Sequence, residues 1–164
     1  MVTLTTEQAW EALARVADPE IPVISVTELG IVRDVRADGD TVAVVVTPTY
    51  SGCPATELIA QEIVSALKAA GAADVRVRTQ LAPAWTTDWI DAAARERLRA
   101  YGIVPPGERS VSDTQPIGFV PRRLACPRCG STDTERLSQF GATACKALYR
   151  CRACAEPFEY FKPL

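Results

Sequence analysis

Two Cys-x-x-Cys pairs near the C-terminus constrain this chain more than any other feature. CPRCG spans residues 126–130 and CRACA spans residues 151–155. Two residues between cysteines let both sulfurs reach one metal ion, and two such pairs supply the four ligands of a zinc ribbon. A module this short cannot build a large apolar core, so bound metal would hold it together. We therefore expect a structural zinc site formed by Cys126, Cys129, Cys151 and Cys154.

Other chemistry for the same four thiols stays open at this stage. An iron-sulfur cluster accepts the same tetrahedral sulfur ligands as zinc. A thiol-disulfide oxidoreductase is disfavoured because the pairs are doubled and lack a thioredoxin-like pattern around them. Cys145 lies between the pairs and is a fifth thiol, one more than a four-ligand site needs. It is either a small buried hydrophobe or a reactive thiol whose thiolate Lys146 would favour.

The chain contains no histidine, which excludes many catalytic sites. Ser-His-Asp triads, Cys-His pairs, HExxH zinc sites and two-histidine iron sites all need that residue. Most familiar hydrolase and oxygenase sites are therefore excluded, and no catalytic site of the chain's own is evident. The N-terminus MVTLTTEQAW resembles no signal peptide, and no apolar run approaches the roughly 18 residues of a membrane span. A cytoplasmic protein without a membrane contact is expected.

Charge divides the chain unevenly. Residues 122–164 carry eight Lys/Arg against four Asp/Glu, whereas the whole chain has a net charge of -2. A basic tail suits nucleic acid or an acidic protein surface equally well. Nucleic acid is the less favoured partner, because we expect most of the tail's aromatic side chains to form the ribbon's small core. These side chains are Phe140, Tyr149, Phe158, Tyr160 and Phe161.

Residues 1–102 have the periodicity of an α+β domain. A capping box, Thr5 with Gln8, starts a helix over 6–17, and Asp38-Gly39 predicts a type I′ hairpin within 32–46. Apolar spacing then predicts a helix over 55–70, a strand over 75–81 and a helix over 86–100. The order is α-β-β-α-β-α, a small mixed sheet covered by helices. Residues 103–121 contain four prolines and two glycines and read as a linker, followed by the ribbon at 122–164.

Cys53 stands apart from the other five cysteines, in the segment TPTYSGCPAT at residues 47–56. Pro54 suits the first position of a helix, which would make Cys53 the N-cap residue. The positive end of the helix dipole would favour a thiolate there, suited to bind metal or to react. The plain alternative is that Cys53 only caps the helix.

DPEIPVISVTELGIV and TPTYSGCPAT resemble the SufT-like family of small α+β proteins associated with iron-sulfur cluster assembly. TPTYSGCPAT, LAPAWTTDWI, ARERLRAYGI and ACKALYRC together resemble the D subunits of bacterial phenylacetyl-CoA epoxidase complexes over nearly the whole chain. The resemblance implies an accessory protein of aerobic phenylacetate degradation that matures or inserts an iron-sulfur cluster in the reductase partner. It also implies that Asp18, Glu20 and Cys53 handle iron or a transient cluster.

A second function remains open beside this one. The chain would then be a structural adaptor that holds epoxidase subunits together and transfers no metal. In both cases the expected partners are other epoxidase subunits, above all the iron-sulfur reductase, and a homodimer stays open. Stable co-purification with the oxygenase favours the adaptor, and absence from it favours an assembly factor.

Overall fold

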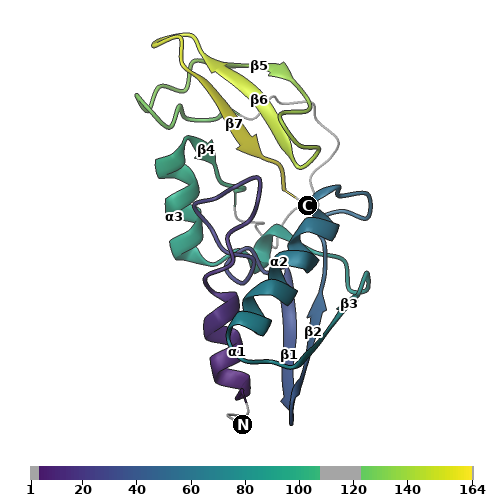
Figure 1. Cartoon of the computed structure of the whole chain (residues 1–164). Helices are drawn as coiled ribbons and strands as arrows, with labels where there is room; N and C mark the ends of the chain where they lie inside the picture. Colours follow the sequence, from purple (N-terminus) through teal and green to yellow (C-terminus); the bar gives the residue numbers. More distant parts are fainter. Residues whose placement is uncertain (1–3, 108–122, 164) are drawn as a thin grey trace. The chain divides into compact units, whose positions relative to one another are not determined.

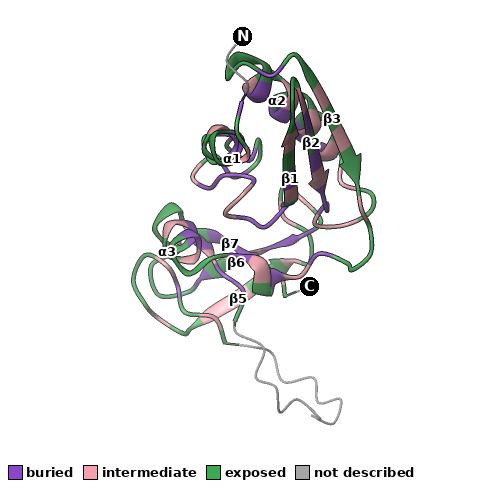
Figure 2. Cartoon of the chain, turned by 90° about the horizontal axis from the view of Figure 1, so that it is seen from below, coloured by how far each residue is buried: buried purple, intermediate pink, exposed green. Residues whose placement is uncertain are grey.

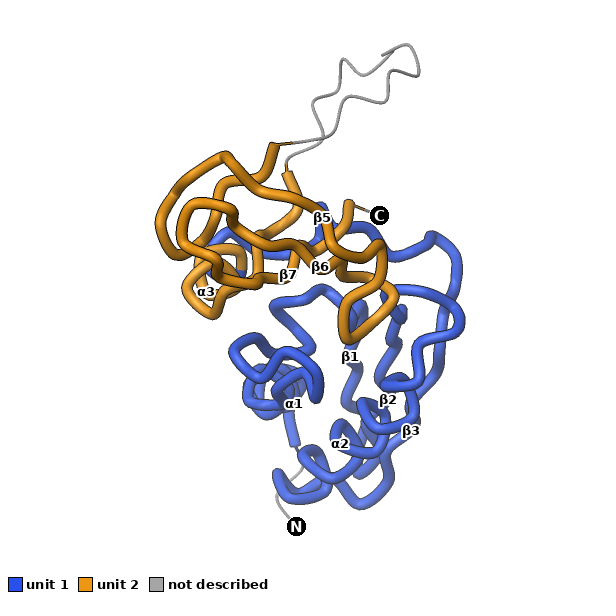
Figure 3. The backbone as a smooth tube through the Cα atoms, turned by 90° about the horizontal axis from the view of Figure 1, so that it is seen from above, with its two compact units in different colours: residues 1–94 blue, residues 95–164 orange. Residues whose placement is uncertain are grey.

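The computed structural model describes residues 4–107 and 123–163 (Figure 1). The chain divides into two compact units, residues 1–94 and 95–164, which are blue and orange in Figure 3. Helices and sheet strands mix within the first unit, and the second unit contains a second sheet, so the expected α+β class is confirmed. No helix within the described ranges is long and apolar enough to cross a membrane.

The first unit is a three-stranded sheet with two helices on one face (Figure 1). Strands β1 (Val32–Asp38) and β2 (Thr41–Val46) are antiparallel, and β3 (Asp74–Thr79) lies parallel to β2. The connection between the parallel strands is α2 (Ala55–Ala69), as such a crossover requires. Buried positions alternate along β2, while β3 is half-buried to exposed (Figure 2).

The first helix, α1 (Thr6–Leu13), has the predicted capping box but is shorter than the predicted 6–17. Thr5 Oγ1 accepts from the Gln8 N–H at 3.2 Å, and the Gln8 side chain accepts from the Thr5 N–H at 3.0 Å. The helix ends early because the next residues pair elsewhere: the Val16 carbonyl accepts from the Val26 N–H at 2.9 Å. Long-range pairing therefore overrides helical periodicity here.

The hairpin between β1 and β2 is present, but its turn differs from the predicted one. Asp38 still pairs with Thr41, so Gly39 and Asp40 are the two connecting residues. Gly39 has φ +57°, and Asp40 is not among the residues with positive φ. A type I′ turn needs positive φ at both positions, whereas a glycine at the first position alone suits a type II′ turn.

The predicted helix over 86–100 is two segments. A short 3-10 helix (Thr87–Trp89) precedes α3 (Ala92–Tyr101). Ile90 between them is extended, with ψ 124°, and its side chain is buried. Asp91 then starts the second segment, because its Oδ1 accepts from the Ala94 N–H at 2.7 Å. Burial of one isoleucine thus interrupts the helix.

The second unit contains a four-stranded sheet in the order β4-β7-β6-β5. Its strands are β4 (Ile103–Val104), β5 (Thr134–Ser138), β6 (Lys146–Cys151) and β7 (Pro157–Phe161). β4 pairs in parallel with β7. Ile103 and Val104 therefore belong to this sheet and not to the linker predicted for 103–121, while residues 108–122 of that linker lie outside the described residues.

Candidate functional site

The two cysteine turns of the second unit are built alike. The Cys126 N–H donates to the Ser131 carbonyl, and the Cys151 N–H donates to the Glu156 carbonyl, each at 2.9 Å. In each turn the residue after the second cysteine is left-handed: Gly130 at φ +74° and Ala155 at φ +62°. The same local structure thus occurs in both cysteine turns. Only the first turn has the glycine that a left-handed conformation favours.

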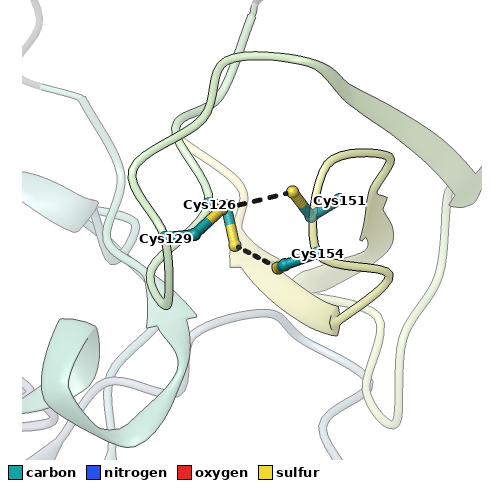
Figure 4. A group of neighbouring side chains, drawn as sticks. All are labelled: Cys126, Cys129, Cys151 and Cys154. Carbon is teal, nitrogen blue, oxygen red and sulfur yellow. Dashed lines mark hydrogen bonds between the residues drawn. The ribbon is translucent and has the colours of Figure 1, made fainter.

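The four sulfurs converge on one point (Figure 4). All four Sγ atoms lie within 4.8 Å of one another, with Cys126 and Cys154 at 3.7 Å and Cys129 and Cys151 at 3.6 Å. A disulfide needs about 2.05 Å. Four ligands at a Zn–S distance of about 2.3 Å in a tetrahedron stand about 3.8 Å apart. The observed spacing therefore fits a tetrahedral metal site.

Backbone donors and crowding set the charge of the thiols. The Cys154 N–H donates to the Cys151 sulfur, which lowers the pKa of Cys151 from 9.0 to about 7. The Glu156 N–H favours the Cys154 thiolate, but partial desolvation and the thiols of Cys129 and its neighbours outweigh it and raise the pKa of Cys154 to about 12. The Cys151 thiolate forms readily and a second thiolate at Cys154 is resisted, so a cation is needed to hold both as thiolates.

The ribbon's small apolar core surrounds the two buried cysteines. Cys126, Cys151 and Phe158 form one buried cluster, against which Val104 and Leu124 pack, together with Tyr149. Sequence reasoning missed Val104; the signal was an apolar pair immediately before two prolines. The aromatic residues of the tail follow the expectation with one exception: Phe140 is 59% exposed.

Cys53 lies outside that group, at the end of the loop between β2 and α2. It is half-buried, its N–H donates to the Tyr50 carbonyl at 3.2 Å, and its carbonyl accepts from Thr56 at 3.2 Å. The N-cap position of α2 belongs to Pro54, with αR geometry and no side-chain cap hydrogen bond. Cys53 is thus one residue before the cap predicted for it, beside a helix end that no side chain caps.

The structure gives Asp18 a definite backbone role. Its carboxylate is buried, and Oδ1 accepts from the N–H groups of Glu20 and Ile21, each at 2.9 Å. It also lines an open groove of about 460 Å³ between α1 and α2, together with Leu58 and others. Glu20 is exposed on the same loop.

The structure does not gather Asp18, Glu20 and Cys53 into a metal-binding group. Within the described ranges, the ribbon cysteines are the one set of three or more Cys, Asp or Glu side chains close enough to share an ion. The role of these three residues in iron handling stays a prediction.

Cys145 is buried, and its sulfur lies 3.0 Å from Thr143 Oγ1. The adjacent Lys146 is only 3% exposed, and its Nζ pairs with Glu159 Oε2 at 2.8 Å. This partly buried ion pair was missed from the sequence, because 13 residues separate its members. The placement fits the alternative of a small buried hydrophobe for Cys145.

Two family models match the chain in separate parts. One, described as an iron-sulfur cluster assembly protein, matches residues 6–79 and so includes Asp18, Glu20 and Cys53. The other, described as the PaaD zinc beta ribbon domain, matches residues 112–162 and includes all four ribbon cysteines.

Individual proteins resemble either the whole chain or its first part. The putative D subunit of the 1,2-phenylacetyl-CoA epoxidase of Escherichia coli is 50% identical over 155 residues, covering 94% of this chain and 91% of its own. An Fe-S protein maturation auxiliary factor of Porphyromonas gingivalis is 35% identical over 57% of this chain and 90% of its own. The crystal structure of a domain of unknown function from Bacillus anthracis has a TM-score of 0.53 at 25% identity, covering 57% of this chain and 90% of its own.

Proposed function

The chain belongs to the PaaD family, the D subunits of 1,2-phenylacetyl-CoA epoxidase, and from this membership we propose that it matures or inserts the iron-sulfur cluster of the epoxidase reductase. It acts as an accessory protein and has no catalytic site of its own. The observation that carries the proposal is that an iron-sulfur assembly domain, residues 6–79, precedes a four-cysteine ribbon in one chain.

Cys53 is the residue that contacts the cargo in this proposal. It is half-buried next to the first turn of α2. The cap residue, Pro54, has no side chain that accepts a hydrogen bond from the backbone N–H groups of that turn. The orphan donors and the helix dipole favour negative charge at that end. A Cys53 thiolate, and the anionic iron-sulfur group that it contacts, would both be stabilised there.

A single thiolate cannot hold a cluster, because iron-sulfur clusters take about four protein ligands. The other ligands then come from the recipient protein or from a second copy of this chain. Such partial ligation suits transfer better than storage, since ligands can exchange one at a time. The proposal therefore treats iron or a cluster as transient cargo.

The ribbon has a different task. Its four thiols are all used within one closed site, which leaves no open position for chemistry and suits structural zinc. Zinc would stabilise the fold of the second unit, and that unit would contact the recipient protein.

The test is replacement of Cys53 by serine in cells that also express the reductase. We expect the purified reductase to lose most of its iron and its visible cluster absorbance, while the substituted chain keeps its circular dichroism spectrum. Ser51→Ala, an exposed change in the same loop, serves as the matched control and should leave the reductase loaded. A fully loaded reductase with Cys53→Ser would refute the proposal.

A structural adaptor is the second candidate, supported by the name of the E. coli relative as a subunit. An adaptor would co-purify with the active oxygenase in a fixed ratio, and Cys53→Ser would not change that ratio. An assembly factor would be absent from the active complex or present in less than one copy.

A further inference from the structure

The hairpin that joins β5 to β6 exposes two large apolar side chains. Leu137 is 50% exposed and Phe140 is 59% exposed. A β-bulge between Arg136 and Ser138 leaves Leu137 without a partner in the ladder and turns it outward. We call four residues the Phe140 knob: Leu137, Phe140, Arg136, which precedes Leu137 in the chain, and Lys162, whose Nζ lies over the Phe140 ring.

Hydrogen bonds hold the loop that carries Phe140. The Phe140 N–H donates to Ser138 Oγ at 3.2 Å, and the Gly141 N–H donates to the Lys146 carbonyl at 2.7 Å. The Ala142 N–H donates to Glu159 Oε1 at 3.0 Å, while the other oxygen of that carboxylate accepts from Lys146. Most of the loop's conformational freedom is therefore already lost before any partner arrives.

Gly141 allows this arrangement. A Cβ on Gly141 would stand 2.6 Å from Glu159 Oε1, whose position is fixed by Lys146 and Ala142. Lys162 adds to the order: its Nζ donates to the Gln139 carbonyl at 3.1 Å and lies 4.6 Å from the centroid of the Phe140 ring. The aromatic ring is thus exposed on a fixed support.

An exposed aromatic side chain on a rigid loop has the properties of an anchor residue at a protein interface. We propose that the Phe140 knob inserts into an apolar pocket rimmed by carboxylates on another subunit of the epoxidase system. The charge requirement follows from Arg136 and Lys162, because the Glu159 carboxylate that holds the loop is already paired with Lys146. Arg136 is exposed, and the neighbouring Glu135 pairs with Arg150 and Arg152. The identity of the partner rests on the proposed function.

Protein fits the knob better than nucleic acid does. The Lys162 ammonium covers one face of the Phe140 ring, which removes a stacking surface for a base. The second apolar side chain, Leu137, is aliphatic and offers no ring at all. An apolar pocket can take up both side chains, and carboxylates at its rim can pair with Arg136 and Lys162.

The experiment measures binding of the full-length chain to each purified epoxidase subunit, the reductase first, by calorimetry. Phe140→Ala should weaken the binding by about tenfold or more, as truncation of an anchor does. Tyr101→Ala, which removes a 54% exposed aromatic from α3, is the matched control and should stay within about twofold. Arg136→Glu should weaken binding more at low salt than at high salt, and Arg78→Glu on β3 should not.

The proposal is overturned if Phe140→Ala binds as the unchanged chain does, or if no subunit binds the unchanged chain. It is equally overturned if Phe140→Ala instead abolishes binding to poly(U) RNA or dissolves a dimer of this chain in light scattering. Failure of the proposed function is read separately: Cys53→Ser would then bind the reductase and leave it fully loaded. The cluster content of the reductase tests the proposed function, and the affinity of Phe140→Ala tests the docking proposal.

Discussion

Cys126 and Cys151 are buried among four thiols that lie within 4.8 Å of one another, whereas Cys53 is half-buried at the start of α2 and outside that group. The four ribbon cysteines are placed to complete a tetrahedral metal site within one chain. Cys53 has no such complement and would need ligands from another molecule. Under the proposed function the same residue type would serve two purposes: closed ligation would stabilise a fold, and incomplete ligation would leave the Cys53 thiol available to a partner.

The two units differ correspondingly in what stabilises them. The first unit buries long aliphatic side chains from both helices and the sheet, among them Leu13, Ile63 and Leu67, which are fully buried. Burial of each contributes roughly 2 kcal/mol. The cluster around the ribbon site has Phe158 and two cysteines as its buried members. Metal ligation would have to supply most of the stability there.

Removal of the metal should produce the largest difference between the units. A strong chelator should unfold residues 123–163, because it removes a binding free energy of about 10 kcal/mol or more. Limited proteolysis should then cut within the ribbon. All three tryptophans, Trp10, Trp85 and Trp89, lie in the first unit, so their fluorescence should not change.

Cys151→Ser should reproduce the effect of the chelator without any added reagent. Cys145→Ser, a change outside the four-ligand set, should leave zinc content at one per chain. If the chelated ribbon resisted protease as well as the metal-loaded one, its stability would have to come from packing and the contrast between the units would fail.

Substitution of Asp18 tests the first unit and should have an effect of intermediate size on its stability. Asp18→Ala should lower the free energy of unfolding by about 2–4 kcal/mol, because two backbone N–H groups lose a charged acceptor. Asp18→Asn keeps an oxygen acceptor and should cost about 1 kcal/mol or less. Urea titration followed by tryptophan fluorescence measures both.

The asparagine variant also separates support from ligation. If Asp18 only supports the backbone, the reductase stays loaded in cells that express Asp18→Asn. An unloaded reductase with a stable Asp18→Asn chain would show instead that the carboxylate binds iron.

The sequence was sufficient for features that depend on local chemistry. The Thr5–Gln8 capping box and each Cys-x-x-Cys pair need only short spacings, and all are present. The doubling of the pair predicted that the two would share one site. The α2 helix, observed at Ala55–Ala69, was predicted within one residue at its end, because its apolar face repeats regularly.

Features that depend on distant partners could not be predicted. The first helix stops early because Val16 pairs with Val26, and β4 exists because β7 accepts it as a neighbour. The Lys146–Glu159 ion pair and the exposure of Phe140 depend on how the ribbon hairpin closes. Local propensity says nothing about such pairings, since they are decided by tertiary structure.

The smallest predicted effect tests the repeat within the metal site itself. Ala155 holds φ +62° where the equivalent residue of the other turn is Gly130 at φ +74°. A non-glycine residue in this region costs about 1 kcal/mol.

Ala155→Gly should therefore strengthen zinc binding by about fivefold, because folding of the ribbon and metal binding are one equilibrium. Gly130→Ala should weaken it by a similar factor, and nothing stands within 4 Å of the added Cβ. The double variant should bind zinc about as the unchanged chain does, which competition with a chromophoric chelator can measure. Unequal effects would show that the two cysteine turns are not equivalent in energy, although the N–H of the first cysteine makes the equivalent hydrogen bond in each.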